Sequence, residues 1–182
     1  MSVARRTRLA NSTTWPRKKR APEISSPLNK TRCLRPEHFA IVLFAILTGL
    51  SRDEQFSLKW SEVDFAASRL QVRGRNVPLH QKACAVLAAL LPLRTTEWIF
   101  EGKGGPTNAH NLVTRIFRSA LAEAGIADFT WQDLRFTCGA RMAAAGVAPH
   151  VVGKFLGVGV RSVITSYGHL VSAELTSAVA AL

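Results

Sequence analysis

The sequence predicts a mainly α-helical domain with a small antiparallel β-sheet. Apolar residues recur every three or four positions over most of residues 36–182, which is the spacing of helices that bury one face. Glycines and prolines stand at the ends of these apolar segments, as expected of helix boundaries. One short region instead holds two apolar runs around an Arg-Gly-Arg turn, which indicates a hairpin.

The segment that begins at residue 36 is predicted to hold two helices. Pro36 is favourable at a first helical position, and Gly49 is a typical helix end. The inward face of this helix is predicted to consist of Phe39, Val42, Leu43, Ile46 and Leu47. Ser51 and Glu54 have the spacing of a capping box, which predicts a second, short helix with Phe56 and Leu58 inward.

The next segment is predicted to form the hairpin and a third helix. The hairpin strands are expected over 70–72 and 76–79, joined by a turn at 73–75. The helix is expected over 81–91, with an apolar face formed by Ala85, Val86, Ala89 and Leu90. Residues 97–100 are expected to add a short edge strand, and 102–106 to form a loop.

Helices are predicted throughout the remainder of the chain. Asn108 and Thr130 are typical helix caps, and Gly125, Gly146 and Gly157 are typical helix ends. The segments expected to be helical are 108–125, 130–146, 149–157 and a short one through 163–167, followed by a last helix over 172–182.

Basic residues dominate the charge of the chain and are concentrated at its beginning. Lys and Arg number 24 against 12 Asp and Glu, which gives a formal net charge of +12. Residues 1–35 hold ten of these bases and one acid, whereas residues 36–182 are only mildly basic. We therefore expect 1–35 to be a flexible basic arm, either phosphate-binding or merely solubilising, and 36–182 to be the folded domain.

The composition also bears on partners and cofactors. The charge excess favours a polyanionic partner, with nucleic acid ahead of an anionic membrane surface. No apolar run approaches the ~18 residues of a membrane-spanning helix, so no membrane role is expected. The three cysteines are far apart and the five histidines lack ligand spacing, so neither a disulfide framework nor a metal site is predicted. A reducing cytoplasm suits this cysteine pattern.

Three strings carry a resemblance to a known family. The first is Thr48-Gly-Leu-Ser-Arg-Asp-Glu54, continued by Trp60-Ser-Glu-Val-Asp64; the second is Trp131-Gln-Asp-Leu-Arg-Phe-Thr137; the third is Phe155-Leu-Gly157 with Tyr167-Gly-His-Leu170. In order and spacing they resemble the catalytic domain of the tyrosine recombinases, the phage integrase family. The resemblance covers about residues 34–182 and implies the mixed, mainly helical fold of that domain.

The resemblance implies site-specific DNA recombination and integration of the kind that mobile elements carry out. Members of this family break duplex DNA through a 3′-phosphotyrosyl intermediate and rejoin it without a cofactor. The implied partners are double-stranded DNA and other recombinase protomers. The implied location is the cytoplasm, in association with the nucleoid.

Carried over residue by residue, the resemblance retains two of six catalytic positions. Tyr167 stands at the position of the nucleophile, and Arg135 at that of the second arginine. Ser51 replaces the first arginine, Gln132 and Val158 replace two histidines, and the lysine of the hairpin turn has no counterpart. Weaker phosphate contacts are assigned to Gln132, Arg52, Arg73, Arg75 and Lys154.

Cationic groups matter in this chemistry because negative charge collects on the phosphoryl oxygens in the transition state. Loss of one preorganised donor typically lowers the rate roughly 10²–10³-fold, so four losses predict an impaired active site. Two alternatives stay open, a non-catalytic DNA-binding protein and a truncated remnant of an integrase. The family assignment predicts that Arg135 and Tyr167 face one shallow cationic pocket.

Each candidate also has a simpler structural interpretation. Tyr167 is the only tyrosine of the chain, and a lone tyrosine on a short amphipathic helix is usually a packing residue. Arg135 would then form a surface salt bridge with Asp133 or Asp128. In the same interpretation, Ser51 would be an N-cap, Val158 an apolar filler and His169 a structural polar group.

Overall fold

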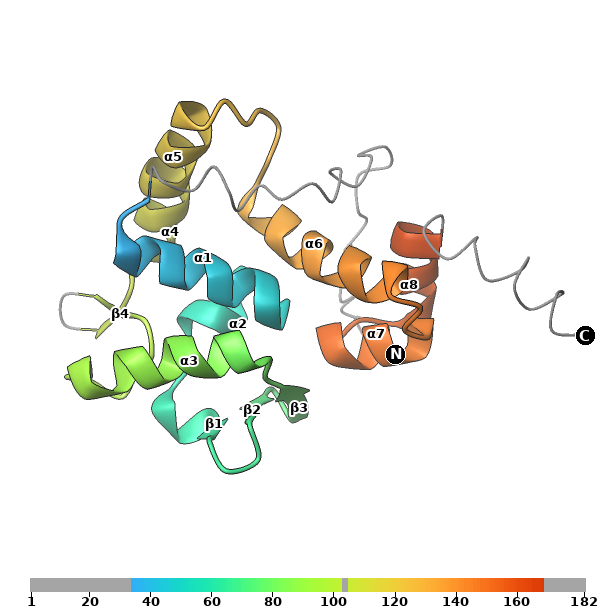
Figure 1. Ribbon diagram of the computed structural model, residues 1–182, viewed down its shortest axis with the longest axis horizontal. Coiled ribbons are helices and arrows are strands. Elements are labelled where there is room, and N and C mark those ends of the chain that lie inside the picture. Colours follow the sequence, from blue (N-terminus) through green and yellow to red (C-terminus); the bar gives the residue numbers. More distant parts are fainter. Residues whose placement is uncertain (1–33, 103–104, 169–182) are drawn as a thin grey trace, which may run out of the picture.

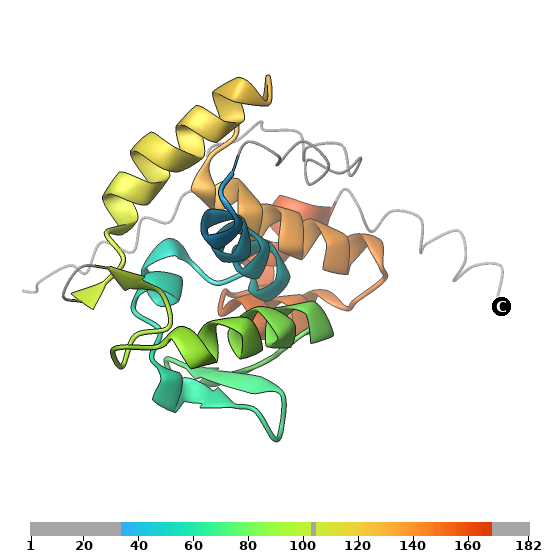
Figure 2. The same ribbon diagram turned by 60° about the vertical axis from the view of Figure 1, so that its left-hand side comes forward.

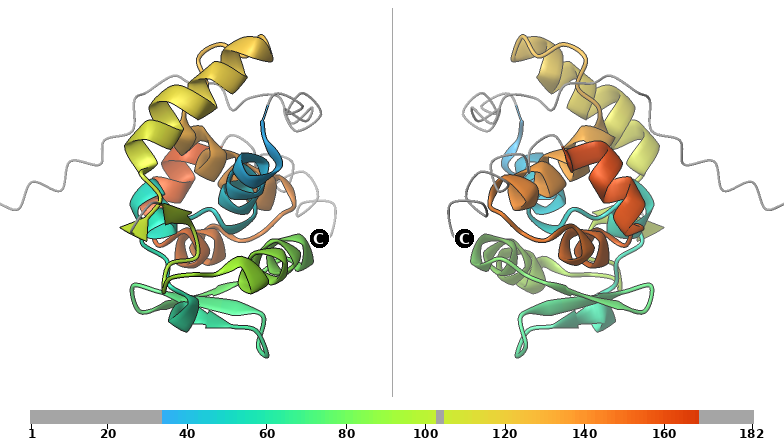
Figure 3. Two further views of the ribbon diagram at one scale, coloured as in Figure 1. Left: turned by 90° about the vertical axis from the view of Figure 1, so that its left-hand side faces the viewer. Right: turned by 90° about the vertical axis from the view of Figure 1, so that its right-hand side faces the viewer.

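A computed structural model describes residues 34–102 and 105–168 of the chain (Figure 1). Most of the predicted basic arm, the helix predicted over 172–182 and His169 therefore lie outside the described residues. Within them, the fold is mostly helical with a small three-stranded antiparallel sheet, as the sequence predicts. Figure 3 shows this sheet at the end of the molecule opposite the helix that ends in α5 (Arg118–Glu123).

The first two helices follow the predicted boundaries. Helix α1 (Pro36–Thr48) ends at Gly49, which has a left-handed backbone conformation with a φ of 60°. Helix α2 (Arg52–Phe56) begins with the predicted capping box: the Ser51 N–H donates to the Glu54 carboxylate at 2.9 Å, and the Glu54 N–H donates to Ser51 Oγ at 3.3 Å. Both helix predictions are confirmed.

The buried face of α1 differs from the predicted one. The structure half-buries Phe39, Leu43 and Leu47 and fully buries Phe44. The reason is that α1 is central: it packs against both α3 (Gln81–Leu90) and α6 (Trp131–Ala144), so its apolar surface extends around more than one stripe. The residues of α1 that are buried are Ile41, Val42, Phe44, Ala45, Ile46 and Thr48.

The hairpin is confirmed and gains a strand that the sequence did not predict. Strands β2 (Arg69–Val72) and β3 (Arg75–Pro78) are antiparallel, with Leu70 opposite Val77. Arg73 and Gly74 make the turn, both with positive φ. The additional strand β1 (Val63–Asp64) follows the 3-10 turn η2 (Trp60–Glu62) and pairs with β2.

Helix α3 (Gln81–Leu90) forms where expected, and the 3-10 turn η3 (Leu91–Leu93) follows it. Its predicted face is only partly confirmed: Val86 and Leu90 pack against the core, but Ala85 and Ala89 are exposed. The fully buried residues are Ala83 and Leu87 instead. Alanines fit either face of a helix, so they did not fix its rotation, which packing against α1 sets instead.

The edge strand predicted over 97–100 does not form. Trp98 makes an isolated bridge with Lys59, and the consecutive residues Ile99 and Phe100 are both buried. A half-buried edge strand alternates its faces, so two adjacent core residues are incompatible with one. The predicted loop over 102–106 instead contributes to a small antiparallel pair, β4 (Glu101–Gly102) with β5 (Gly105–Pro106).

The helices of the C-terminal half are confirmed. Helix α4 (Ala109–Asn111), the π-helical segment η4 (Leu112–Phe117) and α5 (Arg118–Glu123) run on as one helix, here called the α4–α5 helix, which Figure 2 shows crossing beside α1. Helices α6 (Trp131–Ala144), α7 (Pro149–Leu156) and α8 (Val160–Tyr167) follow. The predicted stops at Gly125, Gly146 and Gly157 all have left-handed φ values.

Two hydrophobic clusters hold these elements together, and α6 contributes to both. In the larger one, aromatic rings from distant segments meet: Phe44 lies 5.3 Å from Phe100, and Phe56 lies 5.5 Å from Trp131. The smaller cluster joins the end of α6 to α7 and α8 and includes Tyr167. Among the described residues, no helix is long and apolar enough to cross a membrane.

Candidate active site

Arg135 projects from α6 into the interior and is bound there by main-chain carbonyl groups. Its Nη1 donates to the carbonyl of Gly49 at 2.8 Å, and its Nη2 donates to the carbonyl of Leu156 at 2.6 Å. The arginine thereby ties the end of α1 and the end of α7 to α6. Only 9% of its side chain is exposed to solvent.

Glu54, which the sequence suggested only as a capping residue, lies between two arginines. Both Glu54 carboxylate oxygens accept from Arg75, from Nη1 at 2.6 Å and from Nη2 at 3.0 Å. Arg135 Nη1 lies 3.5 Å from Glu54 Oε2. These three residues are called the Glu54 cluster below. A two-pronged pairing of guanidinium and carboxylate is a strong, directional interaction.

The protonation of Glu54 reflects these partners. Burial is the largest single influence and would raise the pKa of its carboxyl group. The hydrogen bonds from Arg75 and the Ser51 N–H, with the charges of Arg75 and Arg135, together outweigh burial and lower the pKa to about 2. The carboxylate is therefore charged at neutral pH. Burial also lowers the pKa of Arg135, an effect that the charge of Glu54 opposes.

The Glu54 cluster also reaches the glycine that ends α7. A Cβ on Gly157 would lie 2.6 Å from Arg75 Nη1, so the guanidinium occupies the space that a side chain would need. This contact joins strand β3 to the α7 end, and β3 and α7 pack against each other. The cluster is thus a junction of α1, α2, β3, α6 and α7.

Tyr167, the last residue of α8, lies flat against α6 and is 6% exposed. A Cβ on Gly139 would lie 2.5 Å from the phenol oxygen, so this glycine leaves the space that the ring occupies. The Phe136 ring meets the Tyr167 ring edge to face, with centroids 6.1 Å apart. Burial raises the pKa of Tyr167 to about 12, although the charge of Arg135 acts in the opposite direction.

The structure brings Arg135 and Tyr167 together but not in the expected pocket. Arg135 lies on α6 one turn before Gly139, against which the Tyr167 ring packs, and both side chains are buried. The hollow beside Tyr167 is small and lined mainly by apolar side chains, among them Val147, Val152 and Ile164. The expectation of a shallow cationic pocket around these two residues is therefore not met in this structure. Their catalytic roles stay predictions.

The structure gives Arg135 a different partner from the surface salt bridge considered in the sequence. Its carboxylate partner is the buried Glu54. Asp133 instead accepts hydrogen bonds from the N–H and the hydroxyl of Thr130, both at 2.6 Å, at the start of α6. A long-range pairing of this kind has no local sequence signal.

The other candidate positions are spread over the surface and the core. Gln132 is half-buried three residues before Arg135. Arg52 is half-exposed and pairs with the adjacent Asp53 at 3.1 Å. Arg73, at the hairpin turn, and Lys154, on α7, are exposed. Ser51 is an N-cap, as the simpler interpretation predicted.

Val158 packs beside the smaller hydrophobic cluster, so its interpretation as an apolar filler is confirmed. Across the described ranges 34–102 and 105–168, no group of three His, Cys, Asp or Glu residues is placed to hold a metal ion.

Sequence reasoning missed two residues that shape this site, Glu54 and Gly139. The signal for Gly139 was present, since a glycine inside a helix often has a packing reason such as a close approach. The signal for Glu54 was ambiguous, because a capping box alone accounts for a glutamate at this position.

The only tyrosine of the chain allows a direct measurement at this site. The ultraviolet absorbance of tyrosinate should appear only as the pH approaches about 12. The raised pKa stabilises the fold fully below about pH 10, and this stabilisation of about 3 kcal/mol is lost as the pH rises towards about 12.

Gly139→Ala should move the ring off α6 and shift this ionisation towards the ordinary value of about 10. Gly159→Ala is the matched control, because a Cβ at this position meets nothing within 4 Å. It should leave the pKa of Tyr167 unchanged. An ordinary pKa in the unaltered protein would show that Tyr167 is not buried.

Comparisons with known proteins identify the sequence pattern. Residues 17–174 match the profile of the phage integrase family. The integrase of Salmonella phage P22 is 28% identical over 156 residues, a match that covers 75% of this chain and 40% of that protein. The chain therefore spans less than half the length of this relative.

Solved structures have the same fold. XerA recombinase superposes with a TM-score of 0.68 at 20% identity, over 84% of this chain and 62% of that one. The Tn1549 transposon integrase, solved in complex with transposon right end DNA, superposes with a TM-score of 0.67 at 16% identity, over 79% and 59%. These likenesses confirm the predicted fold class.

Proposed function

The chain belongs to the phage integrase family, and on that premise we propose that it binds duplex DNA as a site-specific recombination protein whose breaking and rejoining activity is impaired. Double-stranded DNA is the proposed partner, with other recombinase protomers beside it. The proposed place of action is the cytoplasm, at the nucleoid, within the life cycle of a mobile element.

Exposed cations support the DNA-binding part of the proposal. Arg73 and Lys154 are exposed, and within the described residues neither makes an ion pair. They belong to the hairpin and to α7, and β3 and α7 pack against each other. Cations that are not paired within the protein are available to replace the counterions of DNA, which is the main source of affinity for its backbone.

The single observation that carries the impairment is the engagement of Arg135. Its two terminal nitrogens donate to main-chain carbonyls at 2.8 Å and 2.6 Å, and it shares the single negative charge of Glu54 with Arg75. A guanidinium stabilises a phosphoryl transition state only if its N–H groups point at the phosphoryl oxygens. In this arrangement Nη1 and Nη2 each commit an N–H to a main-chain carbonyl and the side chain is only 9% exposed, so fewer of its five N–H donors remain to meet a phosphoryl group.

The phenol is unsuited to attack for a related reason. A tyrosine must lose its proton as it attacks phosphorus, and the raised pKa of Tyr167 makes this loss harder. Ser51, Gln132 and Val158 stand where the family resemblance places cationic or proton-donating groups. These three side chains therefore offer little to lower that pKa or to protonate a leaving oxygen.

The test is a trap for the covalent intermediate. The full chain is incubated with a pool of nicked duplexes of random sequence, in which the nick prevents religation. We expect no protein–DNA adduct above the level of Tyr167→Phe, since four missing groups that each contribute roughly 10²–10³ in rate leave no useful turnover. An adduct formed by the unaltered chain and absent from Tyr167→Phe would overturn the impairment, whereas failure to bind any duplex would overturn the DNA-binding part.

A further inference from the structure

Phe136 lies on the same face of α6 as Gly139, the residue against which the Tyr167 ring packs. Positions three apart are neighbours on a helix, so the Phe136 ring and the uncovered backbone at Gly139 form one surface. Figure 1 shows α8, which ends at Tyr167, beside the C-terminal end of α6, and the two helices pack against each other. This pair of residues, called the Phe136–Gly139 surface below, is therefore the part of α6 that receives the Tyr167 ring.

The Phe136–Gly139 surface contacts the phenol in two different ways. A Cβ on Gly139 would lie 2.5 Å from the phenol oxygen and 2.5 Å from the ring carbon that carries it, so the hydroxyl end of the ring rests on the backbone of α6. The Phe136 ring meets the Tyr167 ring edge to face, with an angle of 67° between the ring planes. Edge-to-face packing is a preferred geometry of aromatic pairs, so Phe136 orients the phenol as well as covering it.

Phe136 is the outer ring of this aromatic pair. It is half-buried and packs at the margin of the smaller hydrophobic cluster, whereas Tyr167 is a buried member of that cluster. Of two rings in contact, the more exposed one lies on the solvent side of the other. Truncation of Phe136 therefore opens the phenol to water from outside the fold.

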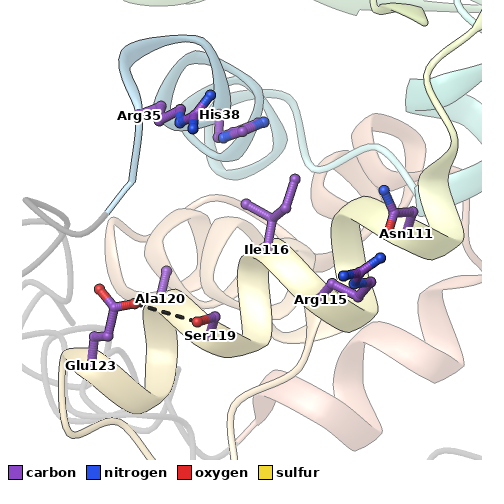
Figure 4. Close-up of a pocket in the computed structure, with 8 residues that line it drawn as sticks. All are labelled: Arg35, His38, Asn111, Arg115, Ile116, Ser119, Ala120 and Glu123. Atoms are coloured by element: carbon purple, nitrogen blue, oxygen red, sulfur yellow. Dashed lines mark hydrogen bonds between the residues drawn. The ribbon is translucent and has the colours of Figure 1, made fainter. Parts of the chain in front are cut away.

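The hollow on another side of the phenol offers little room for water. It lies between α7, α8 and the end of α6, and its volume is about 10 Å³, which is about the least that holds one water molecule. A larger groove, of about 640 Å³, lies between the start of α1 and the α4–α5 helix, and its lining does not include Tyr167 or the Phe136–Gly139 surface (Figure 4). Neither hollow hydrates the phenol, so the cover that Phe136 provides decides its contact with water.

We propose that Phe136 is a positioning residue for Tyr167: its ring holds the phenol against Gly139 and keeps water from the phenol oxygen. The proposal rests on the recombination function proposed above only in taking Tyr167 as the nucleophile. A phenol held in this place lies one turn of α6 from Arg135 and retains its proton, because a phenolate is poorly solvated there. Phe136 itself does not react, and it acts only through the place and the surroundings that it gives to Tyr167.

The test follows the ionisation of Tyr167 by ultraviolet absorbance in the full chain, without DNA. The chain has one tyrosine, so the tyrosinate signal belongs to this residue alone. Phe136→Ala should lower the pKa of Tyr167 from about 12 towards the ordinary value of about 10, because water then reaches the phenolate. Phe136→Leu keeps a large apolar side chain at this place and should restore most of the difference.

Phe129→Ala is the matched control. Phe129 is also half-buried, and its ring packs against that of Phe117, with centroids 6.3 Å apart, beside the larger hydrophobic cluster. Its truncation removes the same atoms as Phe136→Ala and loosens the fold without touching Tyr167. The pKa of Tyr167 should therefore stay at about 12 in Phe129→Ala.

Two results would overturn the proposal. One is a pKa of Tyr167 that stays at about 12 in Phe136→Ala, and the other is an equal fall in Phe129→Ala, which would make the fall an effect of loosening alone. Urea unfolding checks that each variant is folded; if Phe136→Ala is not, Phe136→Val takes its place, with Phe129→Val as its control. Because no DNA takes part, either result leaves the proposed function standing, whereas the covalent trap tests that function whatever the role of Phe136.

Discussion

Replacing Arg135 by methionine is expected to destabilise the fold by about 3–5 kcal/mol. Methionine has a similar length and no charge, so it leaves the carbonyls of Gly49 and Leu156 without their donors in the interior. It also removes one of the two cations beside the buried Glu54. Both losses follow from burial, and neither depends on catalysis.

Urea unfolding at neutral pH measures this effect, and Arg52→Met provides the control. Arg52 has half of its side chain exposed and pairs only with Asp53 on the surface, so its replacement should change stability by less than about 1 kcal/mol. If Arg135→Met were as stable as Arg52→Met, Arg135 would not be anchored in the interior. The proposal that the Arg135 guanidinium is engaged inside the fold would then fail.

Arg135→Lys separates the charge of this residue from its shape. A lysine ammonium keeps the positive charge beside Glu54, but its single nitrogen does not reproduce the planar fork that reaches two carbonyls at once. The lysine variant should therefore fall between the methionine variant and the unaltered chain. An intermediate stability would show that both the charge of Arg135 and the planar shape of its guanidinium group contribute to joining α1 and α7.

The helix ends were predictable because their signals are local. Gly49, Gly125, Gly146 and Gly157 each take a left-handed conformation, which glycine adopts without strain. The Ser51 capping box depends on residues three positions apart. The faces of α1 and α3 were predicted less well, because the rotation of a helix is set by the elements packed on it and not by its own sequence alone.

The candidate site was predictable as a set of residues but not as an arrangement. The sequence places Arg135 and Tyr167 near each other through the family resemblance, and the structure does bring them to the same stretch of α6. Whether an arginine faces a phosphate or an internal carboxylate depends on a partner 81 positions away, Glu54. The same guanidinium geometry suits both partners, so residue type alone does not distinguish them.

The Glu54 cluster also explains why two of the predicted phosphate ligands are not equivalent to the others. Arg75 and Arg135 are engaged with Glu54, whereas Arg73 and Lys154 are exposed. Arg75 thus belongs to the interior junction although it lies only two residues from the hairpin turn. Exposure and pairing, which the sequence does not reveal, decide which cations can meet DNA.

Acid should weaken the fold through Glu54 in a defined pH range. The pKa of Glu54 is lowered in the folded state to about 2 from an ordinary value of 4.5, so its stabilisation is present above about pH 4.5 and is lost as the pH falls towards about 2. The size of this contribution is about 3 kcal/mol. At neutral pH, Glu54→Gln should be destabilised by a similar or larger amount, because it leaves the buried Arg135 and the half-buried Arg75 without their counterion.

The measurement is the free energy of urea unfolding as a function of pH for the unaltered chain and Glu54→Gln. The two curves should lie apart at neutral pH and approach each other as the pH falls below about 4.5, because protonation removes from the unaltered chain what the variant already lacks. Glu101→Gln is the matched control: Glu101 is half-buried, and hydrogen bonds from Thr95 and Thr96 also lower its pKa, but it has no arginine partner. A gap for Glu54→Gln that stays constant from neutral to acid pH would mean that Glu54 titrates alike in both states, and the carboxylate would then not hold Arg75 and Arg135.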